Sequence, residues 1–243
     1  MKWSILTVCP ECFTSVLTMP VIARAIRSGA LTVELVDIKD YAPGSFRHID
    51  DSPFGGGAGM VLRCQPVLDA LDAVRGDTGH VVAMTPAGTP YNQKKAHEFA
   101  ERDHLVLICG HYEGMDARIF SHVDEEISLG DYILTGGEPA AMVLLDSVAR
   151  LLPGVLRAAS TEEESFEDGL LEYPQYTQPA DYKGERVPEV LLSGNHEKIR
   201  LWRRKESLRL TRERRPDLLQ GKDLPEEDRR LLAELDQECN SSK

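Results

Sequence analysis

The sequence lacks the marks of several protein classes. It has no run of eighteen apolar residues, so we expect no transmembrane helix and no membrane partner. It has no HExxH motif and its seven histidines follow no metal-ligand spacing, so we expect no protein-bound metal site. The N-terminus lacks the charged segment, apolar stretch and cleavage site of a secretory signal, which predicts an unprocessed, cytoplasmic chain.

Cysteine is sparse, and its spacing predicts no zinc site. There are five cysteines, of which only Cys9 and Cys12 form a C-x-x-C motif. A structural zinc site needs two further ligands at matched spacing, and the sequence offers no second pair. Two interpretations of the motif stay open: a redox pair after a strand, or two reduced and partly buried thiols, which the pattern favours.

Positive charge is scarce overall but concentrated in one segment. The net charge is −12 over 243 residues, which argues against nonspecific nucleic-acid binding by the whole surface. Between His196 and Arg215, however, nine lysines and arginines face only three glutamates. This segment is either a directed site for a polyanion or a solvated helix face paired with acidic neighbours.

Short apolar runs alternate with helical patterns through the first half of the chain. This alternation predicts an α/β fold with a parallel sheet that helices cover on both sides. The predicted strands are Trp3–Val8, Leu31–Ile38, His80–Thr85, Leu105–Cys109 and Val123–Leu129. The predicted helices are Glu11–Ser28, Pro66–Val74, Gln93–Glu101 and Glu138–Leu152.

The composition changes after the last of these helices. We predict a first domain over residues 1–159, a flexible, glutamate-rich linker over 160–172 and a mainly helical second domain over 173–243. The segment Leu170–Leu192 is rich in tyrosine and proline and should be extended. Asn195 is placed to cap the helix that carries the basic cluster, and a last helix should run from Pro225 to Glu238.

Glycine is concentrated in three loops, over residues 53–60, 109–116 and 129–138. The first is either a surface that another molecule approaches closely or a flexible loop tip. The second and third follow predicted strands, where open α/β sheets bind ligands, so two loops on neighbouring strands should form one pocket. Their carboxylates and backbone carbonyls suit amino and hydroxyl donors, such as an adenosine ribose and a cationic sulfonium, better than a polyphosphate.

Two common nucleotide motifs are missing. There is no G-x-x-x-x-G-K-[ST] phosphate loop. The turn after the first strand, Cys9-Pro10-Glu11-Cys12, contains no glycine, which weighs against a Rossmann fold.

Six ordered motifs carry a resemblance that covers Ser52 to about Arg203. They are SPFGGGAGM, ICGHYEGMDAR, EEISLGDYILTGGE, LDSVARLLPGVL, SFEDGLLEYPQYTQP and VPEVLLSGNHEKIRLWR. In order and spacing this set resembles the bacterial tRNA (guanine-N1)-methyltransferase family, TrmD, of the SPOUT superfamily. The resemblance implies a sheet with a C-terminal trefoil knot, a small helical C-terminal domain, and methyl transfer from S-adenosylmethionine to N1 of the guanine at tRNA position 37.

The resemblance also implies which residues act. The methyl donor would be held by Thr85, Pro86, Gly110, Tyr112, Glu113, Leu129, Gly130, Asp131, Tyr132, Ile133, Leu134, Gly136 and Gly137. The general base would be Glu164, where the family has an aspartate, with Arg150 as its catalytic partner. The extra methylene of glutamate moves the carboxylate by about 1 Å. Asp168, in the same segment, is the substitute candidate.

The same resemblance implies partners. Ser165, Arg200, Arg203, Arg204 and Lys205 are candidates for tRNA contacts, and Trp202 could stack on a base or lie in the core. The family implies a homodimer with the active site at the subunit interface, and a requirement for magnesium whose ligands the sequence does not identify. Two rival functions are another SPOUT RNA methyltransferase and a catalytically silent tRNA-binding protein.

Overall fold

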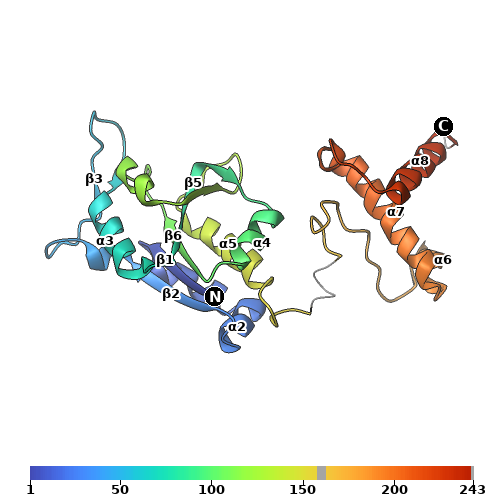
Figure 1. Cartoon of the computed structure of the whole chain (residues 1–243), viewed down its shortest axis with the longest axis horizontal. Helices are drawn as coiled ribbons and strands as arrows, with labels where there is room; N and C mark the ends of the chain where they lie inside the picture. Colours follow the sequence, from blue (N-terminus) through green and yellow to red (C-terminus); the bar gives the residue numbers. More distant parts are fainter. Residues whose placement is uncertain (158–162, 242–243) are drawn as a thin grey trace. The chain divides into compact units, whose positions relative to one another are not determined.

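The protein consists of two compact units, Met1–Arg157 and Ala158–Lys243. The computed structural model describes residues 1–157 and 163–241 (Figure 1). The domain boundary predicted after residue 159 and the first residues of the predicted linker, 160–162, lie outside the described residues. None of the helices in the described residues is both long and apolar enough to cross a membrane.

The first unit is built on a five-stranded sheet in which every strand is parallel to its neighbours. This confirms the predicted α/β class. The order across the sheet is β2, β1, β6, β5, β7, so β6 lies between β1 and β5. The strands are β1 (Lys2–Thr7), β2 (Thr32–Asp37), β5 (His80–Pro90), β6 (His104–Cys109) and β7 (Glu125–Ser128).

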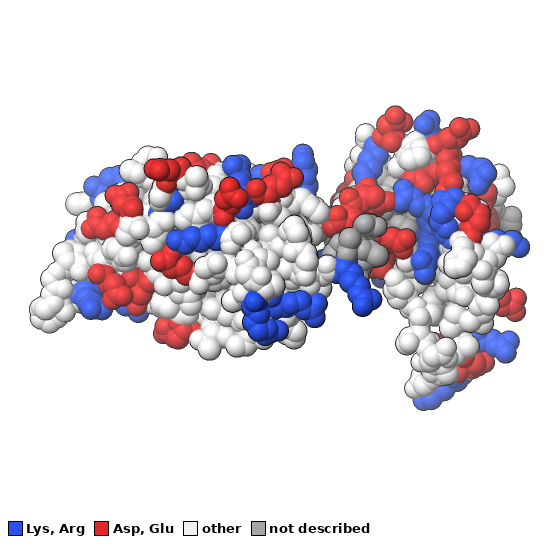
Figure 2. All heavy atoms as spheres, turned by 60° about the horizontal axis from the view of Figure 1, so that its bottom comes forward, with Lys and Arg blue, Asp and Glu red and all other residues white. Residues whose placement is uncertain are grey.

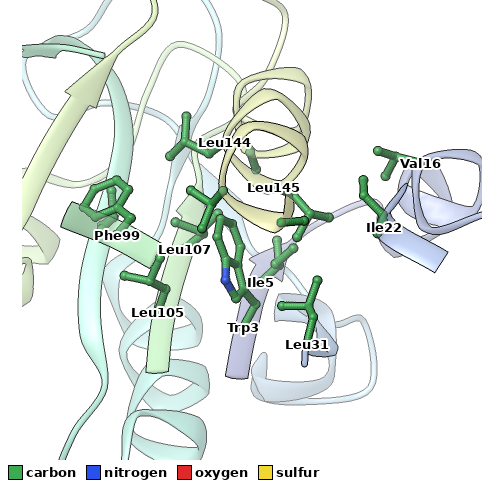
Figure 3. Close-up of a cluster of buried hydrophobic side chains, with 14 of the residues drawn as sticks. Trp3, Ile5, Val16, Ile22, Leu31, Phe99, Leu105, Leu107, Leu144 and Leu145 are labelled. Carbon is green, nitrogen blue, oxygen red and sulfur yellow. The ribbon is translucent and has the colours of Figure 1, made fainter. Parts of the chain in front are cut away.

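Helices cover both faces of the sheet because its central strands are apolar on both sides. Trp3 and Ile5 of β1 point to one face and Leu6 points to the other. The first face packs against α1 (Thr14–Leu17), α2 (Pro20–Arg27), α4 (Gln93–Ala100) and α5 (Glu138–Ala149). Figure 3 shows Leu144 and Leu145 of α5 lying over the side chains of β1 and β6. The second face packs against α3 (Cys64–Arg75) and the short 3-10 helices η2 (Ile38–Tyr41) and η3 (Ala117–His122).

The helix predicted over Glu11–Ser28 is wrong as a single element. The structure has η1 (Pro10–Phe13), α1 and α2 in its place. Proline disfavours helical geometry in the residue before it. Met19, before Pro20, accordingly has ψ 138° and interrupts the helix. Pro20 then starts α2, a position where the backbone N–H has no partner within the helix, so proline loses no hydrogen bond there.

Strand β5 is longer than predicted and changes its pairing on the way. It runs to Pro90, and its register with β7 shifts between Met84 and Thr89. At Gly88 a Cβ would lie 2.4 Å from the carbonyl carbon of Glu126 in β7, so only glycine fits there. The shift frees Thr85 and Pro86 to form a wall at the end of the sheet, where they line a pocket.

The second unit is a pair of helices with its own small core. Helices α7 (His196–Arg214) and α8 (Glu226–Ser241) pack together, and Leu208, Leu231 and Leu235 are buried between them with Leu170. Asn195 caps α7 by accepting a hydrogen bond from Lys198 N, as its position predicted. The remaining elements are the pair β8 (Asp181–Tyr182) and β9 (Glu185–Arg186), α6 (Glu189–Leu192) and η5 (Pro216–Leu219).

The described part of the predicted linker is attached to α7. Leu171 N donates to Thr211 Oγ1 at 2.9 Å, and Ser207 donates to the Leu171 carbonyl. Ser165 Oγ accepts from Glu172 N at 2.9 Å. These hydrogen bonds join the described part of the predicted linker to the second unit.

Candidate functional site

A pocket of about 540 Å³ opens at the carboxyl ends of β5, β6 and β7. The loops after β6 and β7 line it together, as their glycines predicted. They do not follow neighbouring strands, however, because β5 lies between β6 and β7 and adds Thr85 and Pro86 to the wall. Of the thirteen residues predicted to hold a methyl donor, only Asp131 does not line the pocket.

Two glycines that line this pocket let the segment after β7 lie close against the end of β6. Gly137 N donates to the Gly110 carbonyl at 2.7 Å, and Gly136 is bridged to His111. A Cβ on Gly137 would lie 2.7 Å from Cys109 Cα and 2.8 Å from Gly110 N. Because these are backbone atoms, no side-chain movement could relieve the contact. The segment after β7 therefore needs glycine to lie directly on the end of β6.

The first glycine loop meets the second. It leads into β4 (Val61–Leu62), which pairs with β3 (Asp50–Asp51) and also lies along the loop after β6. Glu113 N donates to the Met60 carbonyl at 3.0 Å, and Leu62 N donates to the Gly114 carbonyl at 2.9 Å. A Cβ on Gly59 would lie 2.4 Å from the Glu113 side chain. The first loop thus supports Glu113, although its exposed tip at Phe54 stands away from the fold.

A buried carboxylate, which the sequence analysis did not identify, supports the contact between these two segments. Glu138, the first residue of α5, is 5% exposed and accepts a hydrogen bond from Thr7 Oγ1 at 2.7 Å. Its other carboxylate oxygen lies 3.6 Å from Nδ1 of His111, which lines the pocket. Glu138 thereby links β1 to the loop after β6 and to the segment that leads into α5. Its only signal in the sequence is an acidic residue at the start of a helix, which is typical of exposed positions.

The pocket lining is apolar and uncharged except at a few points. Its side chains include one carboxylate, Glu113, one histidine, His111, and the tyrosines Tyr112 and Tyr132. None of its lining residues, all in the described first unit, is a lysine or arginine. Burial, and then the charge of Asp50, raise the pKa of Tyr112, so its ring stays neutral. The pocket suits a ligand with apolar surfaces and hydrogen-bond donors and disfavours a polyphosphate.

A second cleft, of about 410 Å³, lies within the second unit. Its acidic lining residues are Glu163, Glu164, Asp168 and Glu172, and its basic ones are His196, Arg200, Arg203 and Arg204. The two candidate bases, Glu164 and Asp168, thus share one cleft. Arg150, their predicted catalytic partner, lies in the first unit, directly after α5.

Most cations of the predicted tRNA surface already have carboxylate partners on α8. Arg200 binds Glu227 at 2.7 Å, Arg204 binds Asp228 at 2.6 Å, and Lys205 binds Glu238 at 2.7 Å. These bonds raise the pKa of Arg200, Arg204 and Lys205. Figure 2 shows acidic and basic side chains interleaved over this unit. Arg200, Arg204 and Lys205 of the basic cluster are therefore paired with acidic side chains in this structure.

Arg203 differs from its neighbours on α7. Its guanidinium lies 4.8 Å from the ring centroid of Tyr173 and 3.5 Å from the Glu163 carboxylate. Its Nε is buried and has no hydrogen-bond partner within the described residues. Trp202, beside it, is half-buried with its ring centroid 6.3 Å from that of Tyr176. Arg203 is thus a cation with donor capacity to spare.

No group of three or more histidine, cysteine or acidic side chains in residues 1–157 and 163–241 is arranged to hold a metal ion.

Comparison with known proteins gives a consistent result. The sequence model described as tRNA (Guanine-1)-methyltransferase TrmD matches residues 1–221. The chain is 52% identical over 237 residues to a tRNA (guanine-N(1)-)-methyltransferase of Anoxybacillus flavithermus, covering 96% of this chain and 97% of that protein. It is 51% identical over 242 residues to the protein of the same name from Geobacillus kaustophilus, covering 98% and 99%.

Proposed function

The chain belongs to the tRNA (guanine-1)-methyltransferase family TrmD, and on that premise we propose that it transfers a methyl group from S-adenosylmethionine to N1 of a guanine in tRNA. The guanine we propose is that at position 37, next to the anticodon. The observation that carries the proposal is the pocket that the loops after β6 and β7 build with Thr85 and Pro86 of β5, in a chain about half identical to these relatives. Another SPOUT chemistry and a silent tRNA-binding protein have no comparable support.

The pocket fits the proposed methyl donor. S-adenosylmethionine has an apolar adenine, ribose hydroxyls, an amino group and a sulfonium, and it supplies an activated methyl group. Apolar side chains such as Ile127, Leu129 and Leu134 line the pocket beside the Glu113 carboxylate. A carboxylate without a competing lysine or arginine suits hydroxyl donors and positive charge. We therefore assign to this pocket the methyl-donor site, formed by the twelve predicted residues that line it.

The contact at Gly137 supports a further proposal about the fold. Residues 136–137 lie against residues 109–111, although Gly110 and Gly137 are 27 positions apart in the sequence. We propose that the segment after β7 passes through the loop after β6 to form the trefoil knot of the SPOUT superfamily. Knots are rare among protein folds, so this proposal needs support beyond family membership. The backbone contact at Gly137 supplies that support.

The chain must also make guanine N1 a nucleophile. N1 of the neutral base carries a proton, so a general base has to remove it as the methyl group arrives. We propose Glu164 as this base, which takes the proton on its side-chain carboxylate. Negative charge then develops on the guanine and spreads to O6, and we propose that the guanidinium of Arg150 stabilises it.

Asp168, the substitute candidate for the base, has a structural role in the second unit. One carboxylate oxygen of Asp168 is bound by the Arg204 guanidinium, and the other accepts a hydrogen bond from Leu170 N at 3.1 Å. We propose that Asp168 holds this segment on α7, and that the base is Glu164 because it stands where the family has its aspartate.

A methylation assay on tRNA transcripts tests the activity. With labelled S-adenosylmethionine and a transcript that carries guanines at positions 36 and 37, we expect one methyl group per tRNA, which mass mapping places on N1 of position 37. Replacing that guanine should abolish incorporation. A methyl group on a ribose, or elsewhere in the tRNA, would refute the assignment, and binding of the donor without turnover would support the silent protein.

Three variants test the base. Glu164→Gln should reduce kcat by about 100-fold or more, because general-base catalysis contributes about 10²–10⁴-fold. Glu164→Asp restores the family's residue and should keep activity, while Asp168→Asn is the matched control for a lost carboxylate in the same cleft. Near-normal turnover by Glu164→Gln, with S-adenosylmethionine binding unchanged, would sink the assignment.

We further propose that the enzyme is a homodimer with Arg150 and Glu164 of one active site on different subunits. Mixing the inactive variants Arg150→Ala and Glu164→Gln would then form hybrid dimers that hold one intact site. With random pairing in a twofold dimer, about a quarter of native activity should return. If both residues came from one chain, the mixture would stay as inactive as its components.

The second unit is proposed to bind the anticodon region of tRNA. Arg203 is the strongest candidate for a phosphate contact because it lies 3.5 Å from its carboxylate partner, Glu163, whereas Arg200, Arg204 and Lys205 lie 2.6–2.7 Å from theirs on α8. For each of these four cations a phosphate would have to replace a carboxylate. Removing one true phosphate contact should shallow the salt dependence of tRNA binding by about one unit. A tRNA contact by Ser165 and a magnesium requirement are proposals that rest on the family alone, and a cytoplasmic location likewise stays a proposal.

A further inference from the structure

Two cysteines lie side by side where the chain leaves β1. Cys9 precedes the 3-10 helix η1, and Cys12 is within it. Their Sγ atoms are 2.6 Å apart. The turn itself holds them, because Cys12 N donates to the Cys9 carbonyl at 3.1 Å and Cys9 N donates to Thr7 Oγ1 at 3.0 Å. Cys12 is exposed and Cys9 is half-buried, so reagents in solution can reach the pair.

We propose that Cys9 and Cys12 are a reversible redox site that closes into an intramolecular disulfide by exchange with a small disulfide such as oxidised glutathione. Disulfide sulfurs lie about 2.0 Å apart, so closure needs the two atoms to approach by only about half an ångström. The proposed activity does not use either thiol. The site is therefore separate from the methyl-donor pocket and from the proposed base.

The surroundings give the two thiols different roles. The hydrogen bond with Cys12 is the main reason that the pKa of Cys9 is raised to about 12, and burial and Glu11 add to it. Cys9 therefore keeps its proton, and Cys12 is the more exposed of the two sulfurs, so a disulfide in solution reaches Cys12 first. The thiolate is the reactive form of cysteine, and we assign the attack to the Cys12 thiolate.

The exchange balances in two steps. The Cys12 thiolate attacks one sulfur of the small disulfide, forms a mixed disulfide and releases one thiolate. Cys9 then loses its proton to solvent and attacks the Cys12 sulfur, which forms the Cys9–Cys12 bond and releases the second thiolate. The protein loses two electrons and two protons overall, and the small disulfide is reduced to two thiols. A reducing thiol in excess reverses both steps.

Peptide mapping of the full-length protein tests the proposal. The protein is equilibrated with mixtures of oxidised and reduced glutathione, quenched with acid and alkylated. As the mixture becomes oxidising, the peptide with residues 3–24 should lose two hydrogens and both alkylation sites together. Cleavage after Glu11 should then give two fragments that stay joined until they are reduced. Cys64→Ser, which changes a half-buried cysteine elsewhere, is the matched control and should behave like the native chain.

Single variants test the order of the two steps. Cys9→Ser should stop the exchange at a glutathione adduct on Cys12, and Cys12→Ser should lower glutathione uptake at the remaining cysteine by about tenfold or more. Circular dichroism checks that each variant is folded. Free thiols at both positions in oxidising mixtures, a separate adduct on each cysteine, or a bond to any other cysteine would each overturn the proposal.

Discussion

Replacing Gly137 by alanine tests the close contact between the segment after β7 and the end of β6. Its Cβ would lie 2.7 Å from Cys109 Cα and 2.8 Å from Gly110 N, so the backbone itself must move. Overpacking of this kind costs about 1–3 kcal/mol. In a unit the size of Met1–Arg157 this corresponds to a fall in Tm of about 2–12 °C, which calorimetry would detect. S-adenosylmethionine binding should weaken as well, because Gly137 lines the pocket.

Gly110→Ala is the control on the facing segment. Its Cβ would meet only Met115 side-chain atoms, at 3.5 Å or more, which is ordinary contact. We expect its stability to change by less than about 1 kcal/mol. Gly137 has φ −78° and ψ −12°, which alanine adopts easily, so without the clash alanine should stabilise the fold by about 0.4–1 kcal/mol. A Gly137→Ala protein that melts at or above the native Tm would refute the reasoning.

Three further predictions concern polar contacts. Thr7→Val removes the hydrogen bond from Thr7 Oγ1 to the buried carboxylate of Glu138. The free energy of unfolding, measured in urea, should fall by about 1–3 kcal/mol. An unchanged value would contradict the supporting role of this hydrogen bond. The Arg118 side chain is the main reason that the pKa of Asp116 is lowered to about 2, so carboxyl NMR should find a midpoint near 2 that returns toward 3.8 in Arg118→Ala. Because the folded pKa is the lower one, the stability from this carboxylate is complete above its ordinary pKa and disappears as the pH falls toward 2. Arg204→Met leaves Asp228, 2% exposed, without its cation and should destabilise the second unit by about 3 kcal/mol; if the unit melts normally, the pair is not structural.

The sheet could be predicted because its signal is local. Residues 81–84 and 105–109 are unbroken apolar runs, and both are buried central strands. The order of the strands could not be predicted, since β6 reaches β1 through pairing between residues about a hundred positions apart. The break at Pro20 was present in the sequence and was outweighed by the apolar residues around it.

The sequence predicted where the pocket lies but not which residues support it. Glycine loops after strands mark a ligand edge, and the structure brings both of them to one pocket. The roles of Thr7 and Glu138 depend on burial against a distant strand, which no local pattern reports. The α8 partners of Arg200, Arg204 and Lys205 likewise lie 24 or more positions away, so only the tertiary structure could show that these three cations are paired.

The central position of β1 has a consequence for synthesis on the ribosome. Ser4 hydrogen-bonds to His104 across 100 residues of sequence, so β1 must wait for β6 to be made. At about 5–20 residues per second that wait lasts roughly 5–20 s. During it one edge of β1, with Trp3 and Ile5 beside it, is open to pairing with other nascent chains. Aggregation of this protein should therefore be decided early, by how well chaperones cover its first strand.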